Sequence, residues 1–205
     1  MSGDQAGLRA TLLNCTLKRS PEPSNTEQLL AVVRAELERG GAATTTFRVV
    51  DEAVHEGVAS EPQGEGDGWP AIRAAIVAAQ ILVIATPTWL GQPSSVAKRA
   101  LERMDALISE TGDDGQPIAY GRVAGFVVTG NEDGAHHVIA ELAQAVIDIG
   151  FTVPGQAWTY WNMGPGPGPS YSDTDHGHEW SQSTGETAAR NLLRTARALT
   201  APAAP

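Results

Sequence analysis

Residues 80–98 read QILVIATPTWLGQPSSVAK. The run from Gln80 to Ala85 is almost entirely apolar, which is typical of a strand buried on both faces of a parallel sheet. A loop with two prolines and a glycine follows, and apolar residues at helical spacing predict a helix from about Ser94 to Ile108. The stretch therefore predicts a strand, a loop and a helix in succession, which is the repeating unit of an α/β sheet.

The same alternation continues through the rest of the chain. Further strands are predicted at 8–13, 44–50, 122–129 and 151–158, and further helices at about 24–39, from residue 70, at 135–149 and at 185–199. Strict alternation predicts five parallel strands with helices on both faces, joined by right-handed crossovers. We expect a single domain over 1–205, with a Gly-, Pro- and aromatic-rich insertion at about 161–181.

Composition limits the functions that the chain can have. Its 205 residues include 14 basic and 24 acidic ones, for a net charge of −10, which argues against nucleic-acid binding. The single cysteine cannot form an internal disulfide. The first residues include Asp4 and no apolar stretch, and the apolar run at 74–85 is too short to cross a bilayer, so we expect a cytoplasmic protein.

Three loops are predicted at one edge of the sheet, because ligands of open parallel sheets bind beyond the carboxyl ends of the strands. The first loop, 14–25, leads into a helix through hydroxyl and amide side chains, a pattern that favours anions. The same residues have the spacing of a capping box between Ser24 and Glu27, which is also typical of an ordinary helix start. The second loop, 86–94, carries Trp89, which suits stacking on a planar ring, and the third is 129–134.

Together these loops resemble the flavodoxin-like NAD(P)H-dependent FMN reductases, a family that includes the WrbA-type quinone reductases. Ala85-Thr86-Pro87-Thr88-Trp89-Leu90-Gly91, followed by Ser94-Ser95 and Lys98, is similar to the family's flavin loop. Ser24-Asn25-Thr26 resembles the end of its phosphate loop. The resemblance implies a three-layer sandwich with strand order 2-1-3-4-5, FMN as cofactor and NADPH or NADH as co-substrate. It also implies a flavin or quinone as acceptor and a homodimer or homotetramer.

The resemblance also implies which residues hold FMN. They are Thr16, Lys18, Ser24, Asn25, Thr26, Pro87, Thr88, Trp89, Leu90, Gly91, Thr129, Gly130, Asn131 and Gly134. Those of the first loop would hold the phosphate, and those of the second and third loops would surround the ring. No catalytic acid or base is expected, because hydride transfer to a flavin needs none, and no metal ligands are assigned. The chain departs from the family in having Asn14-Cys15 where Gly-Ser is usual, and Trp89 where Tyr is common.

Several alternatives stay open at this point. A flavodoxin-type electron carrier would also suit the acidic charge, although the first loop lacks the carriers' run of hydroxyl residues. A third hypothesis is a scaffold or regulator that keeps the fold but no longer binds the flavin. The insertion at 161–181 could cover the flavin, contact a partner subunit or pack on the last helix. Its His176 and His178 suggest a metal by composition, although carboxylate-rich loops are usually solvated. Cys15 is interpreted as a small buried residue, with a reactive thiol as the alternative.

Overall fold

The computed structural model describes residues 7–201. The first six and last four residues of the predicted domain, Asp4 among them, lie outside this range. The elements are β1 (Arg9–Asn14), α1 (Asn25–Arg39), β2 (Ala43–Arg48), α2 (Trp69–Ala78), β3 (Ile81–Trp89), β4 (Gln92–Pro93), α3 (Ser95–Met104), β5 (Val123–Thr129), α4 (Ala135–Ile149), β6 (Trp158–Trp161) and α5 (His178–Thr200).

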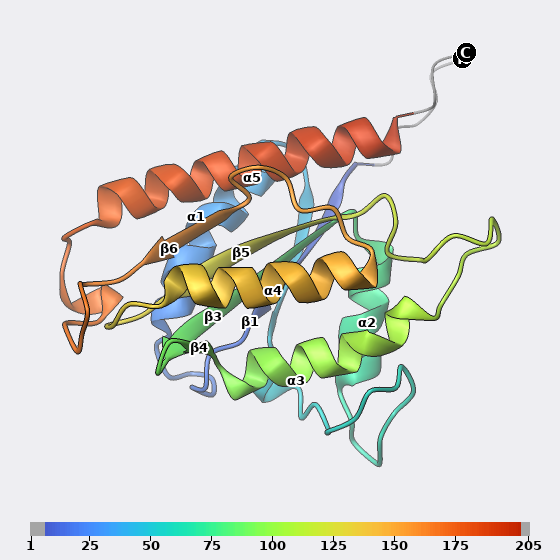
Figure 1. Cartoon of the computed structure of the whole chain (residues 1–205), viewed down its shortest axis with the longest axis horizontal. Coiled ribbons are helices and arrows are strands. Elements are labelled where there is room, and N and C mark those ends of the chain that lie inside the picture. Colours follow the sequence, from blue (N-terminus) through green and yellow to red (C-terminus); the bar gives the residue numbers. More distant parts are fainter. Residues whose placement is uncertain (1–6, 202–205) are drawn as a thin grey trace.

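Five parallel strands form the sheet in the order β2-β1-β3-β5-β6. This confirms the predicted order 2-1-3-4-5 for the five main strands, and the short β4 adds an antiparallel pairing to the end of β3. Helices α1 and α5 cover one face of the sheet, while α2, α3 and α4 cover the other (Figure 1). The result is the expected three-layer sandwich. Within residues 7–201, no helix is both long and apolar enough to cross a membrane.

Two apolar cores hold the layers together, one on each face of the sheet. In the core under α1 and α5, Leu29, Leu30 and Leu192 are almost fully buried. Burial of one such side chain contributes roughly 1.5–3 kcal/mol. The central strand β3 is buried from Ile81 to Thr86, as its continuous apolar run predicts.

A buried ion pair fixes the long loop between β2 and α2. The Arg103 guanidinium on α3 lies 2.7 Å from the Asp67 carboxylate, and neither side chain is accessible to solvent. Arg103 also donates to the carbonyls of His55, Ala59 and Glu61. Burial opposes ionisation of Asp67, but hydrogen bonds from Arg103 and from backbone N–H groups hold its pKa well below the usual range. Arg103 therefore ties this acidic loop to α3.

Two predicted boundaries near the C-terminus are wrong. The last strand is β6 at 158–161, not 151–158, because Pro154 has no N–H to continue the ladder and only Thr152 forms a bridge there. Helix α5 begins at His178, not Gly185, so the insertion shortens to 162–177, which we call the connecting segment. The first turns of α5 are held against β6, because the Thr159 hydroxyl on β6 donates to the Ser181 carbonyl on α5 at 2.6 Å.

The predicted loop at 86–94 is a β-hairpin. Strand β3 continues to Trp89 and pairs with β4 across a two-residue turn. Leu90 and Gly91 at this turn have φ of 53° and 71°, the left-handed combination that suits the twist of hairpin strands. The helix predicted to reach Ile108 ends as α3 at Met104 and continues as a 3-10 turn.

Candidate functional site

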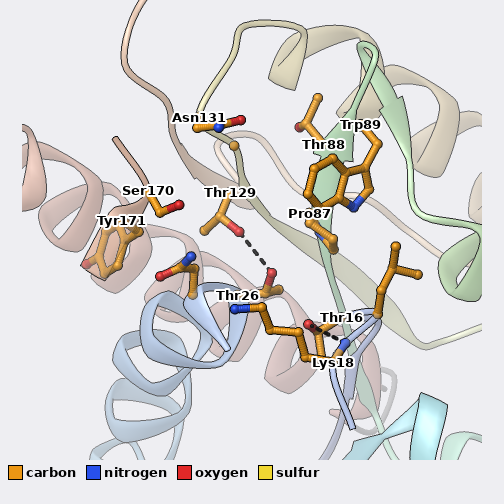
Figure 2. Close-up of a pocket in the computed structure, with 13 residues that line it drawn as sticks. Thr16, Lys18, Thr26, Pro87, Thr88, Trp89, Thr129, Asn131, Ser170 and Tyr171 are labelled. Carbon is orange, nitrogen blue, oxygen red and sulfur yellow. Dashed lines mark hydrogen bonds between the residues drawn. The ribbon is translucent and has the colours of Figure 1, made fainter. Parts of the chain in front are cut away.

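A pocket of about 210 Å³ opens where the carboxyl ends of β1, β3 and β5 meet. The order of the strands reverses between β1 and β3, which is the usual place for a ligand in this kind of sheet. Figure 2 shows Trp89 and Asn131 on opposite sides of the pocket, with Ser170 and Tyr171 forming a further wall. The lining residues are Thr16, Leu17, Lys18, Asn25, Thr26, Pro87, Thr88, Trp89, Thr129, Gly130, Asn131, Ser170 and Tyr171.

The structure brings together all of the predicted site residues except four. Ser24, Leu90, Gly91 and Gly134 do not line the pocket. Leu17, Ser170 and Tyr171 line it but were not assigned to the site from sequence. The sequence signal for Ser170 and Tyr171 is the aromatic insertion, for which covering the flavin was one of the predicted roles.

Asn14 and Ser24 shape the first loop. Ser24 caps α1 as predicted, because its hydroxyl accepts the Glu27 N–H at 3.1 Å. The predicted return contact from the Glu27 carboxylate to Ser24 is wrong. That carboxylate instead accepts from the Asn14 amide at 2.7 Å and from Arg34 at 3.3 Å. The Asn14 side-chain oxygen Oδ1 accepts the Thr16 N–H at 3.1 Å, so Asn14 fixes the start of the loop.

Besides Asn25, two polar residues of the first loop line the pocket, Thr16 and Lys18. Thr16 is buried, and its hydroxyl accepts the Lys18 N–H at 3.3 Å. The Lys18 ammonium is about half exposed and lies 3.6 Å from the Glu22 carboxylate. Cys15 is fully buried, and burial raises the pKa of its thiol to about 12. The interpretation of Cys15 as a small buried residue is therefore confirmed.

The hairpin is tied to both neighbouring loops. The Ser94 hydroxyl donates to the Cys15 carbonyl at 2.6 Å, and the Gly91 N–H donates to the Glu132 carboxylate at 3.3 Å. Gly134 packs so closely that a Cβ there would lie 2.7 Å from the Gly91 Cα. Gly91 and Gly134 thus position the hairpin, while Trp89 stays 52% exposed at the mouth of the pocket.

Four buried threonines give the pocket a polar lining: Thr16, Thr26, Thr88 and Thr129. The hydroxyls of Thr26 and Thr129 lie 2.9 Å apart and bond to each other (Figure 2). The Thr88 hydroxyl is buried and has no hydrogen-bond partner within the described chain. A buried hydroxyl is normally paired, so Thr88 indicates a polar ligand group beside it. Hydroxyls, a cation and helix N–H groups around one cavity fit the phosphate and polar ring edge of FMN.

The connecting segment joins two of the loops. The Gly168 N–H donates to the Asn131 carbonyl at 2.7 Å, and the Ser172 N–H donates to the Asn25 side-chain oxygen at 3.0 Å. Tyr171 stacks on His178 of α5, with ring centroids 3.8 Å apart. The segment therefore both lines the pocket and packs on the last helix.

The two histidines near this segment are engaged in structural contacts. The His176 carbonyl accepts from the Trp161 indole at 2.8 Å, and the His178 Nε2 lies 2.9 Å from the Tyr171 carbonyl oxygen. In the part of the chain that the structure describes, no group of three or more His, Cys, Asp or Glu side chains is placed to hold a metal ion.

Comparisons with known proteins agree with this geometry. The sequence profile of the family described as NADPH-dependent FMN reductase matches residues 9–165. The chain is 40% identical over 204 residues to the divalent metal cation transporter MntH of Mycobacterium bovis, covering 97% of this chain and 30% of that protein. It is 38% identical over 166 residues to 8-demethyl-8-aminoriboflavin-5′-phosphate synthase of Streptomyces davaonensis, covering 77% of this chain and 64% of that protein. The chain thus spans less than two thirds of the length of both relatives.

Among solved structures, the chain is similar to RosB with the bound intermediate 8-demethyl-8-formylriboflavin-5′-phosphate. The TM-score is 0.85 at 33% identity, covering 94% of this chain and 80% of that one. The matched profile spans all three loops of the pocket, and the structural match covers 94% of the chain. On this evidence, the chain belongs to the family of NADPH-dependent FMN reductases.

Proposed function

We propose that the pocket binds FMN and that the protein passes a hydride from NADPH or NADH, through the flavin, to a flavin or quinone acceptor. The observation that carries the proposal is the buried, unpartnered Thr88 hydroxyl in a cavity between β1 and β3. When bound, FMN supplies the redox chemistry, because its ring accepts a hydride and releases it to the acceptor. Membership of the family supports the same cofactors.

Each group of side chains has a separate task in this proposal. Thr16, Lys18 and Asn25 hold the phosphate by charge and hydrogen bonds. Trp89 and Asn131 lie on opposite sides of the cavity and position the ring between them. Hydride transfer requires two planar rings held face to face, so the chain contributes placement rather than an acid or a base.

The relatives support a second candidate function, in which the flavin is a substrate rather than a lasting cofactor. RosB, at 33% identity, has been solved with a modified riboflavin 5′-phosphate described as an intermediate. The Streptomyces relative at 38% identity is named as a synthase of another modified riboflavin 5′-phosphate. The same pocket could then hold a riboflavin phosphate whose ring is changed by the reaction.

One experiment separates these functions. Protein loaded with FMN under argon is mixed with NADPH and then with NADH, and its visible absorbance is followed. Bleaching by either nucleotide, recovery of the bands on adding a quinone, and unchanged FMN by mass spectrometry support the oxidoreductase.

Three other outcomes of this experiment would point to a different function or to none of those proposed. A chemically modified flavin after turnover supports the second function. Bands that bleach only with dithionite favour the electron carrier, and a protein that takes up no FMN overturns both proposals. The homodimer or homotetramer and the cytoplasmic location stay predictions, the former testable by sedimentation.

A further inference from the structure

We propose that a second cavity, at the outer edge of the sheet, binds an adenine ring. This edge cleft has a volume of about 370 Å³ and lies between β6 and the first half of α5. Its walls include three consecutive residues of β6 and three residues on one face of α5: Trp158, Thr159, Tyr160, Trp180, Thr184 and Thr187. The edge cleft shares no residue with the flavin pocket, so the site does not depend on the proposed function.

Strand β6 presents an unpaired backbone edge to this cleft. Among the described residues it pairs only with β5, and Figure 1 shows α5 running alongside it. The Ala157 carbonyl accepts the Phe126 N–H at 3.0 Å, and Phe126 is aligned with Trp158. In a parallel ladder this register turns the backbone groups of the odd-numbered residues towards β5. The Trp158 C=O and the Tyr160 N–H therefore point outward, as an acceptor and a donor next to each other.

Aromatic side chains supply surfaces on which a planar ring can stack. The rings of Tyr160 and Trp180 meet edge to face, with centroids 5.1 Å apart and planes at 65°, so they form a corner rather than a closed stack. Trp158 adds a third ring to the lining, and Trp180 is 40% exposed. A flat ligand that enters this corner can lie against an aromatic face while its edge meets the backbone of β6.

The polar side chains of the cleft are neutral and largely engaged within the protein. No charged side chain lines the cleft, although the chain has 14 basic and 24 acidic residues. The Thr184 and Thr159 hydroxyls bond to each other at 2.7 Å, and the Thr187 hydroxyl donates to the Ser183 carbonyl at 3.0 Å. This lining favours an uncharged ring that carries its own donor and acceptor.

Adenine has the edge that this arrangement requires. Its amino group can donate to the Trp158 carbonyl, and the ring nitrogen beside that amino group can accept the Tyr160 N–H. Nucleobases are commonly held in this way, by hydrogen bonds to one edge and by stacking on aromatic side chains. A quinone has only acceptor oxygens and would leave the Trp158 carbonyl unmatched.

The first experiment measures adenosine binding by calorimetry on the full chain with FMN added, so that the flavin pocket is occupied. We expect Trp180→Ala and Thr187→Trp to weaken adenosine binding about fivefold or more, because the first removes a stacking surface and the second fills the cleft. Tyr120→Ala is the control, since Tyr120 is 54% exposed and lines neither cavity. The riboside of 6-dimethylaminopurine keeps the ring but has no amino protons, and it should bind about fivefold or more weakly than adenosine.

A kinetic experiment identifies the source of the ring, and this arm rests on the proposed hydride transfer. Reduced nicotinamide mononucleotide carries the same hydride as NADH but no adenine. If the co-substrate fills the cleft, Trp180→Ala should raise the ratio of the KM for NADH to the KM for the mononucleotide about fivefold or more. An unchanged ratio together with weaker adenosine binding would support the site and assign it to a separate adenine nucleotide or nucleoside.

Several results would overturn the inference. It is wrong if adenosine does not bind, if both cleft variants bind adenosine as the unmodified protein does, or if the dimethylated riboside binds equally well. It is also wrong if sedimentation shows a dimer that both variants dissociate, because a second copy then covers the free edge of β6. Adenosine binding requires neither FMN nor hydride transfer, so a protein that takes up no FMN still tests the cleft. Urea unfolding checks folding, and Thr187→Trp carries the test should Trp180→Ala unfold.

Discussion

The hydroxyl oxygens of Thr26 and Thr129 lie 2.9 Å apart, although 103 positions separate the two residues in the chain. The bond joins the start of α1 to the end of β5 inside the pocket. We expect Thr26→Val to lower the free energy of unfolding by about 1–3 kcal/mol, because it leaves the Thr129 hydroxyl buried and unpaired. Urea unfolding should show that the double change to valine costs less than the sum of the two single changes. Strict additivity would contradict the bond.

Thr88→Val should have opposite effects on stability and on binding. Without ligand, the variant should unfold at the same or a slightly higher urea concentration, because it removes a buried hydroxyl that has no partner. Its FMN affinity should fall about tenfold, since the ligand loses a hydrogen bond. Thr88→Ser keeps the hydroxyl and is the control. Unchanged FMN affinity in Thr88→Val would show that this hydroxyl does not meet the flavin.

Gly134→Ala should displace the hairpin. Gly134 has φ of 107°, and a Cβ there would lie 2.7 Å from the Gly91 Cα. Gly115 also has a positive φ, of 75°, but open space around it, so Gly115→Ala isolates the cost of backbone strain. We expect Gly134→Ala to be the more destabilising of the two by about 1–3 kcal/mol and to weaken FMN binding. Equal unfolding midpoints for the two variants would rule out the collision.

Trp89→Ala should weaken flavin binding without unfolding the protein. Trp89 is 52% exposed at the mouth of the pocket, and stacking of aromatic rings contributes about 0.5–1.5 kcal/mol, roughly two- to twelvefold in affinity. Trp89→Tyr should keep most of the flavin affinity of the unmodified protein. Trp180, which is 40% exposed and lines a different cavity, provides the control substitution to alanine. A similar loss of affinity in both alanine variants would mean that the effect is not local.

Asp67 should make stability depend on pH in the acid range. Its pKa is lowered in the folded state, so the unfolded chain takes up the proton first as the pH falls. The stabilisation by Asp67 is therefore complete above its unfolded pKa of about 3.9 and is lost as the pH falls towards the folded pKa.

Asp67→Asn tests this directly. The variant should lose about 3–5 kcal/mol at neutral pH, because Arg103 is left buried without its counter-charge. Its free energy of unfolding should also change less with pH in the acid range than that of the unmodified protein. Urea unfolding from pH 7 to pH 3 measures both effects, and parallel curves for the two proteins would contradict the assignment.

The alternation of strands and helices follows from local patterns in the sequence, whereas the strand order was implied by the resemblance to the FMN reductase family. The apolar run of β3 and the helical spacing after it are properties of neighbouring residues, so they can be read directly. Ser170 could not be placed in the same way. Its segment contacts Asn25 through the backbone N–H of Ser172, which lies 147 positions away in the chain. The residues around Ser170 carry no pattern that predicts this contact.

The error in the start of α5 has a similar origin. Residues 178–184 contain several polar residues with modest helix propensity, and their helix is held by tertiary contacts such as Thr159 with Ser181. Gly185, predicted to begin the helix, instead lies inside it, where a Cβ would come within 3.3 Å of the Thr159 methyl group. Tertiary packing, which local propensity does not report, therefore decides where α5 begins.

The burial of Cys15 makes its thiol a natural reporter on the opening of the first loop, beside the pocket residue Thr16. A thiol-reactive dye needs an accessible thiolate, and the native state offers neither access nor a low pKa at this position. Labelling must therefore wait until the first loop opens away from the hairpin, where the Ser94 hydroxyl holds the Cys15 carbonyl. Because the chain has a single cysteine, the rate of labelling measures how often that opening occurs, with no engineered probe.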